Sequence, residues 1–127
     1  MKASNLHDLW ASPDNSRVTT KQYSFRLPVH VAAKIEALCE MFPTKTRTQI
    51  VGDLLASALE EVERGFPFVA GEHYGRDPDT GEELYEDVGK GARFRGLTNK
   101  HYVAMEKDLG NEDPSLLYPH EVIGPKE

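Results

Sequence analysis

Three polar residues at alternate positions, Gln22, Ser24 and Arg26, are the strongest candidates for chemistry in this sequence. An Arg guanidinium donates two hydrogen bonds to guanine O6 and N7, a Gln amide pairs with adenine N6 and N7, and a Ser hydroxyl bonds several bases. The major groove of DNA exposes these base edges and admits a two-stranded β-ribbon. The pattern therefore indicates contact with base edges, provided that the three side chains share one face of a strand.

The residues around these three alternate with them, in the stretch KQYSFRLP. Tyr23, Phe25 and Leu27 fall on the opposite side, and this period of two predicts a half-buried strand that Pro28 ends. A strand needs a partner for its backbone N–H and C=O groups. No comparable strand lies within hairpin distance, so we expect this one to pair with the same segment of a second copy.

A first amphipathic helix follows the strand. From Val29 to Phe42 apolar residues, among them Ile35 and Leu38, recur at three- and four-residue steps. Pro43 is expected to end this helix.

A second amphipathic helix is predicted over residues 47–64. Thr46 and Gln49 form an S/T-x-x-E/Q capping box just before it. A broad apolar stripe that includes Ile50 and Leu54 then runs along the segment.

About 45 residues with one strand and two helices cannot bury enough surface alone. Two copies solve this problem, because their strands pair as an antiparallel ribbon over a shared core of four helices. The opposite face of the ribbon then carries the three polar side chains twice, related by a two-fold axis. The expected dimer core contains Tyr23, Phe25, Leu27, Ile35, Leu38, Ile50 and Leu54.

This order of elements resembles the ribbon-helix-helix repressors of the MetJ/Arc type, over about residues 20–64, roughly a third of the chain. QYSFRLP matches the ribbon, VHVAAKIEALCEMFP the first helix and TRTQIVGDLLASALEEVE the second. The resemblance implies base reading by Gln22, Ser24 and Arg26. It also implies that a DNA phosphate lies at the start of the second helix, where free N–H groups and the helix dipole attract anions. The implied phosphate contacts are Lys21, Lys45, Thr46, Arg47 and Thr48.

The charge of the chain is unevenly distributed. The formal net charge is −6, made of +2 over residues 1–28, −2 over residues 29–65 and −6 over residues 66–127. Between Asn15 and Pro28 there are three basic residues and no acid. We therefore expect the acidic C-terminal part to lie away from the DNA, since it would otherwise repel the phosphates.

Three segments are predicted: a flexible N-terminal arm over 1–18, a dimerisation and DNA-binding domain over 19–65, and an acidic extension over 66–127 that serves oligomerisation, ligand or protein binding. The fold class is mainly α with a short β-ribbon, an intertwined ribbon-helix-helix homodimer, plus a small irregular α+β C-terminal extension. Within the extension we expect strands at 66–74 and 82–88 around a turn at 77–81, a third strand at 92–94, a helix from Thr98 to Gly110, and an extended tail over 111–127.

Other chemistries find little support in the sequence. Cys39, the one cysteine, lies on the apolar face of the first helix and is expected in the core, in a reducing cytosol. The five histidines have no ligand spacing, so we predict no metal and no cofactor. With no catalytic pair, no signal peptide and no apolar run near ~20 residues, the expectation is a cytoplasmic protein that is not an enzyme.

The predicted function is that of a homodimeric, sequence-specific DNA-binding protein, a transcriptional repressor. Its partners are double-stranded DNA, itself as a homodimer or a higher oligomer on DNA, and a protein bound through residues 66–127. One alternative is an antitoxin whose C-terminal segment wraps a toxin and folds on binding. A second is a non-DNA assembly module that keeps the dimer fold; Lys21 and Arg26 count against it.

Overall fold

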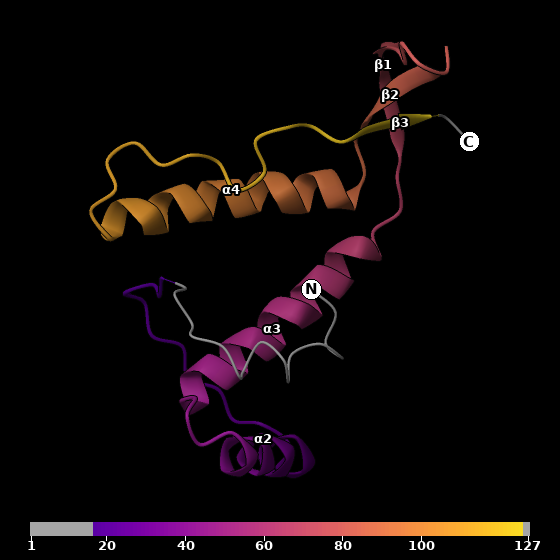
Figure 1. Ribbon diagram of the computed structural model, residues 1–127. Coiled ribbons are helices and arrows are strands. Elements are labelled where there is room, and N and C mark those ends of the chain that lie inside the picture. Colours follow the sequence, from indigo (N-terminus) through magenta and orange to yellow (C-terminus); the bar gives the residue numbers. More distant parts are fainter. Residues whose placement is uncertain (1–16, 126–127) are drawn as a thin grey trace. The chain divides into compact units, whose positions relative to one another are not determined.

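The computed structural model describes residues 17–125, shown in Figure 1. The predicted arm over residues 1–18 lies outside the described residues except for its last two. The described chain is a mixed α+β structure, with three helices and a three-stranded antiparallel sheet. The elements are α2 (Val29–Met41), α3 (Arg47–Arg64), β1 (Ala70–Arg76), β2 (Glu83–Asp87), α4 (Lys90–Asp108) and β3 (Ile123–Pro125). None of these helices is long and apolar enough to span a bilayer.

The chain divides into two compact units, Met1–Val62 and Glu63–Glu127. The described part of the first unit contains α2 and most of α3, and both helices have the predicted bounds within a residue. The predicted capping box at the start of α3 is confirmed. The N–H of Gln49 donates to Oγ1 of Thr46 (3.1 Å), and the N–H of Thr46 donates to Oε1 of Gln49 (2.9 Å).

The core of the first unit is thin. Ile50 is the one fully buried hydrophobic residue that the structure describes. Leu38, Cys39, Phe42 and Leu54 pack against it, and each remains partly exposed.

The segment 21–28 forms no strand in the single chain. Its backbone is extended at Pro28 (φ −54°, ψ 146°), where α2 begins. A strand requires hydrogen-bonding partners, and the predicted ribbon takes its second strand from a second chain. The pairing of two such segments therefore stays a prediction.

The second unit contains the antiparallel hairpin that the sequence predicts. β1 and β2 flank a turn in which the N–H of Gly81 donates to the carbonyl of Asp77 (2.8 Å), and the N–H of Asp77 donates to that of Glu82 (2.8 Å). Gly81 has a φ of +75°, a backbone conformation that favours glycine. β1 begins later than predicted and continues to Arg76.

Two predictions about the following segment are wrong. Residues 92–94 are not a strand but belong to the first turns of α4, and Thr98 is not its cap. The helix begins after Gly89, and the Oγ1 of Thr98 donates to the carbonyl of Phe94 (2.7 Å) within it. Glycines at 91 and 96 weaken the local helix signal. The predicted end is confirmed, because α4 stops at Asp108 and Gly110 has a φ of +94°.

The tail after α4, predicted to be extended over residues 111–127, contains a strand that the prediction did not include. It runs back beside α4 to the sheet (Figure 1), where β3 pairs antiparallel with β2. Asn99 holds its middle, since Nδ2 donates to the carbonyl of Tyr118 (3.0 Å) and Oδ1 accepts from the N–H of Tyr118 (2.9 Å). β2 is thus the central strand, in the order β1-β2-β3.

Candidate nucleic-acid interface

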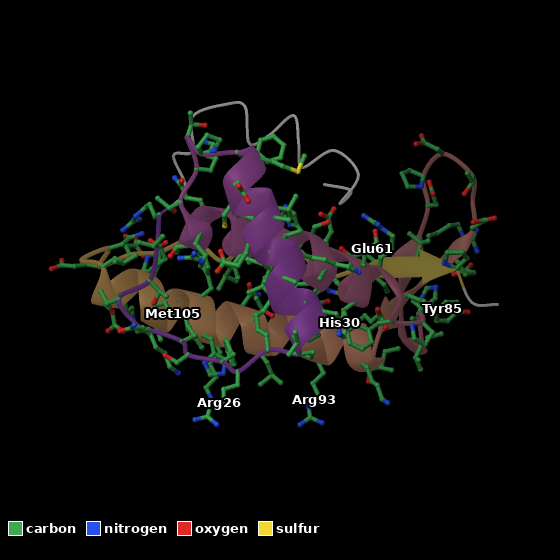
Figure 2. All side chains as sticks on the ribbon, turned by 90° about the horizontal axis from the view of Figure 1, so that it is seen from below. Arg26, His30, Glu61, Tyr85, Arg93 and Met105 are labelled. Atoms are coloured by element: carbon green, nitrogen blue, oxygen red, sulfur yellow. The ribbon has the colours of Figure 1, made fainter. Side chains whose placement is uncertain are left out.

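The three predicted base-contacting residues, Gln22, Ser24 and Arg26, all lie in the described segment and are all exposed. Figure 2 shows the side chain of Arg26 projecting away from the backbone. The rings of Tyr23 and Phe25 stack on each other, with centroids 6.2 Å apart and an interplanar angle of 17°. These two side chains, two positions apart, therefore lie on the same side of the segment.

The apolar side of this segment is largely uncovered. Tyr23, Phe25 and Leu27 are 52%, 72% and 47% exposed. The ammonium of Lys21 lies over the Tyr23 ring, 5.3 Å from its centroid. Three neighbouring large apolar side chains in water form the kind of patch that marks an interaction surface.

The start of α3 presents free backbone donors. By their position in the first turn, the N–H groups of Arg47 and Thr48 have no acceptor within the helix. The N–H of Gln49 is bonded to Thr46, whose hydroxyl is therefore engaged in the capping box. Of the predicted phosphate contacts here, the two free N–H groups and the Arg47 and Lys45 side chains remain the main candidates.

Arg47 is held by an acid that the sequence reasoning missed. Its Nε and one terminal nitrogen donate to the two carboxylate oxygens of Glu36 on α2, at 3.1 and 2.8 Å. This hydrogen bonding lowers the pKa of Glu36 and raises the pKa of Arg47. Both side chains are more than half exposed, so solvent screens the pair. The pair joins two helices, and helical periodicity within either one does not reveal it.

In the second unit a buried ion pair joins the sheet to α4. One carboxylate oxygen of Asp87 accepts from the N–H groups of Gly89 (2.9 Å) and Val69 (3.2 Å), and the other from Arg95 (3.1 Å). The Asp87 and Arg95 side chains are 6% and 15% exposed. Burial raises the pKa of Asp87, but these hydrogen bonds outweigh burial and hold that pKa below its usual value. Asp87 therefore fixes the place where β2 ends and α4 begins.

We expect Asp87→Ala to destabilise the second unit by about 3–5 kcal/mol at neutral pH, because it leaves Arg95 buried without its partner. The folded-state pKa of Asp87 lies below the unfolded one, so its contribution is present above the unfolded pKa of ~3.9 and is lost as pH falls through the folded value. Urea unfolding at neutral and at strongly acidic pH measures this. The exposed turn variant Asp79→Ala is the control, and equal losses for both variants would contradict the assignment.

An open pocket of about 420 Å³ lies in the second unit between α4 and the returning tail. Its wall includes the Asp87–Arg95 pair and Asn99, whose polar groups bond within the protein. No buried side-chain nitrogen or oxygen is left without a hydrogen bond in the part of the chain described. Nor do residues 17–125 contain a group of three or more His, Cys, Asp or Glu placed to hold a metal ion. The interface around the segment 21–27 therefore remains the best candidate site.

The chain matches no protein-family model, and comparison with curated proteins and with solved structures found no significant match. The resemblance to ribbon-helix-helix repressors rests on residues, order and spacing within this chain.

Proposed function

We propose that this protein is a homodimeric, sequence-specific DNA-binding protein, a transcriptional repressor, that inserts a β-ribbon made from residues 21–27 of two chains into the major groove. One observation carries the proposal most directly. A segment of alternating pattern exposes its apolar side, Phe25 at 72%, beside two helices that bury one hydrophobic residue. In a monomer the apolar side of this segment has nothing to pack against.

A second copy supplies what the first unit lacks. Antiparallel pairing of the two segments satisfies their backbone groups and turns both apolar sides toward the helices. The outer face of α3 also needs cover, since Leu55 and Leu59, one turn apart, are 52% and 53% exposed. Burial of each large apolar side chain contributes roughly 1.5–3 kcal/mol. A dimer therefore gains several times more free energy from apolar burial than a single chain does.

The polar side of the ribbon has the chemistry for the groove. Arg26 and Gln22 offer the bidentate hydrogen bonds that identify guanine and adenine, and the two-fold axis presents them twice. Phosphates on the flanks meet the N–H groups of Arg47 and Thr48. These contacts position the ribbon, while the base contacts supply specificity.

The alternatives fit the structure less well. An antitoxin segment folds upon its toxin, whereas residues 63–127 have a sheet, a helix and a buried ion pair of their own. An assembly module has no need of a basic groove-facing surface, which Lys21 and Arg26 supply here. Both observations favour DNA binding with a compact extension.

Selection of bound sequences from random duplex DNA tests the proposal. The full chain should enrich a motif with two related half-sites, since a two-fold protein reads a two-fold operator. A variant with Gln22, Ser24 and Arg26 all changed to alanine is the control and should enrich nothing. The proposal fails if the unaltered protein recovers no motif above that control.

Glu36→Gln should strengthen binding to all duplex sequences alike, by several-fold at low salt. The change releases the Arg47 side chain from the Glu36 carboxylate and removes a negative charge close to the proposed phosphate contact. Fluorescence anisotropy with specific and random duplexes measures both affinities. Glu40→Gln, also exposed on α2 but not paired with Arg47, is the matched control. Unequal gains on the two duplexes would contradict a phosphate-binding role for Arg47.

A further inference from the structure

The outer face of α4 is basic, within a unit that is otherwise acidic. Lys90, Arg93, Lys100 and Lys107 are all exposed, and steps of three and seven residues bring them to one side of the helix. Figure 2 shows Arg93 projecting from α4 into solvent. None of the four side chains forms a hydrogen bond or an ion pair with another described residue. The one exposed acid on α4 is Asp108, at its last position.

This distribution differs from that of an ordinary solvated helix, in which acids alternate with bases at steps of three and four residues. Around Arg93, Lys100 and Lys107 those positions hold no acid. The other base of the helix, Arg95, turns inward to Asp87. α4 therefore separates its charges, with its unpaired cations on the outside.

We propose that this basic face of α4 binds the sugar-phosphate backbone of the DNA duplex whose major groove the ribbon enters; the inference rests on the proposed function. The first and last of the four cations are 17 positions apart, roughly 25 Å along the helix axis. At about 3.4 Å per base pair this length follows some seven base pairs of backbone. The free cations and a polyanion are complementary in charge.

A protein surface is a less suitable occupant. Protein interfaces have an apolar centre from which charges are depleted. On the exposed face of α4 the one large apolar side chain is Leu97, 45% exposed. A long, narrow and strongly cationic face instead fits a line of phosphates.

The contact adds affinity and not specificity, because phosphates carry no sequence information. Once the ribbon is in the groove, the second unit is tethered at high local concentration, so even weak phosphate contacts contribute. The acidic hairpin β1-β2 is repelled by the same phosphates, so the expectation that the acidic part lies away from the DNA applies to the hairpin and not to α4.

The test compares two full-length double variants of equal charge change. Arg93→Gln/Lys100→Gln removes two cations of the face, while Lys34→Gln/Arg76→Gln removes two exposed cations elsewhere, of which Arg76 is bonded to Glu83. Gln is a good helix former, so α4 should persist, and circular dichroism checks this. The affinity for duplexes that extend a full turn beyond the selected site on either side is measured between about 50 and 200 mM salt.

The face variant should bind at least tenfold more weakly at the lowest salt and flatten the plot of log affinity against log salt by up to about 3.6, at 0.9 per lost contact and four contacts per dimer. Its preference for the selected motif should not change. An unchanged slope, with motif binding intact, overturns this inference alone. A wild type that binds no duplex overturns the proposed function with it. A fall in assembly size without DNA assigns the face to copy–copy contact and also overturns the inference.

Discussion

Phe25→Asp is expected to abolish both the dimer and the fold of the first unit. In one chain Phe25 is 72% exposed, so the change itself is harmless there; in the proposed dimer the carboxylate enters the shared core twice. Burial of an unpaired charge costs several kcal/mol per ion, which is comparable with the whole stability of a small domain. Sedimentation should show a monomer, and far-UV circular dichroism should lose the contribution of α2 and α3.

The control is Ser24→Asp, which places the same charge one residue away on the opposite side of the strand. It should keep the dimer and the helices but lose DNA binding, since the new carboxylate meets the phosphates and base edges of the groove. A second measurement concerns the unaltered protein. If it sediments as a folded monomer at micromolar concentration, the shared core does not exist.

Arg26→Ala should remove most of the sequence preference while the fold remains intact. Arg26 is exposed and points away from the backbone (Figure 2), and exposed substitutions usually change stability by less than ~0.5 kcal/mol. One bidentate Arg–guanine pair supplies ~1–3 kcal/mol of discrimination. Because the two-fold axis doubles the change, the preference for the operator over random DNA should fall by roughly two orders of magnitude or more. Competition binding against random duplex measures this ratio.

Arg47→Ala distinguishes phosphate contacts from base contacts. Loss of a phosphate contact should weaken binding to every sequence and reduce the salt dependence, while the preference ratio stays as it was. The same binding assay should therefore give opposite results for the two substitutions: Arg26→Ala lowers the sequence preference, and Arg47→Ala lowers the affinity for every sequence. An Arg26→Ala protein with the unaltered preference would show that the ribbon does not read the bases.

The first unit was the more predictable part because its signals are local. The capping box of Thr46 and Gln49 and the proline at 43 mark helix ends by backbone chemistry within a few residues. The alternation around Phe25 likewise places side chains by geometry alone. Whether two such segments pair depends on a second chain, and that is a property no local pattern contains.

The second unit was less predictable because its determinants act over distance. α4 is longer than expected since Asp87 and Arg95, eight positions apart, join in the fold and offset the cost of a glycine, Gly91, in the first turn. β3 forms because Asn99 holds Tyr118 and directs the tail to the sheet. The first unit has one such contact as well, the pair of Arg47 on α3 with Glu36 on α2. Each joins residues whose own neighbours in sequence give no sign of it.

The place of β3 has a consequence for the order of folding. The hairpin β1-β2 closes a short loop, whereas β3 reaches β2 only after α4 and the whole tail have been laid down. Contacts between distant residues form slowly, because the entropy of loop closure is lost before the pairing is gained. During synthesis β3 also emerges after its partner. Until it docks, β2 has an open edge that can pair with strands of other chains. The growing chain is therefore most prone to aggregate in the interval between completion of the hairpin and arrival of residues 123–125.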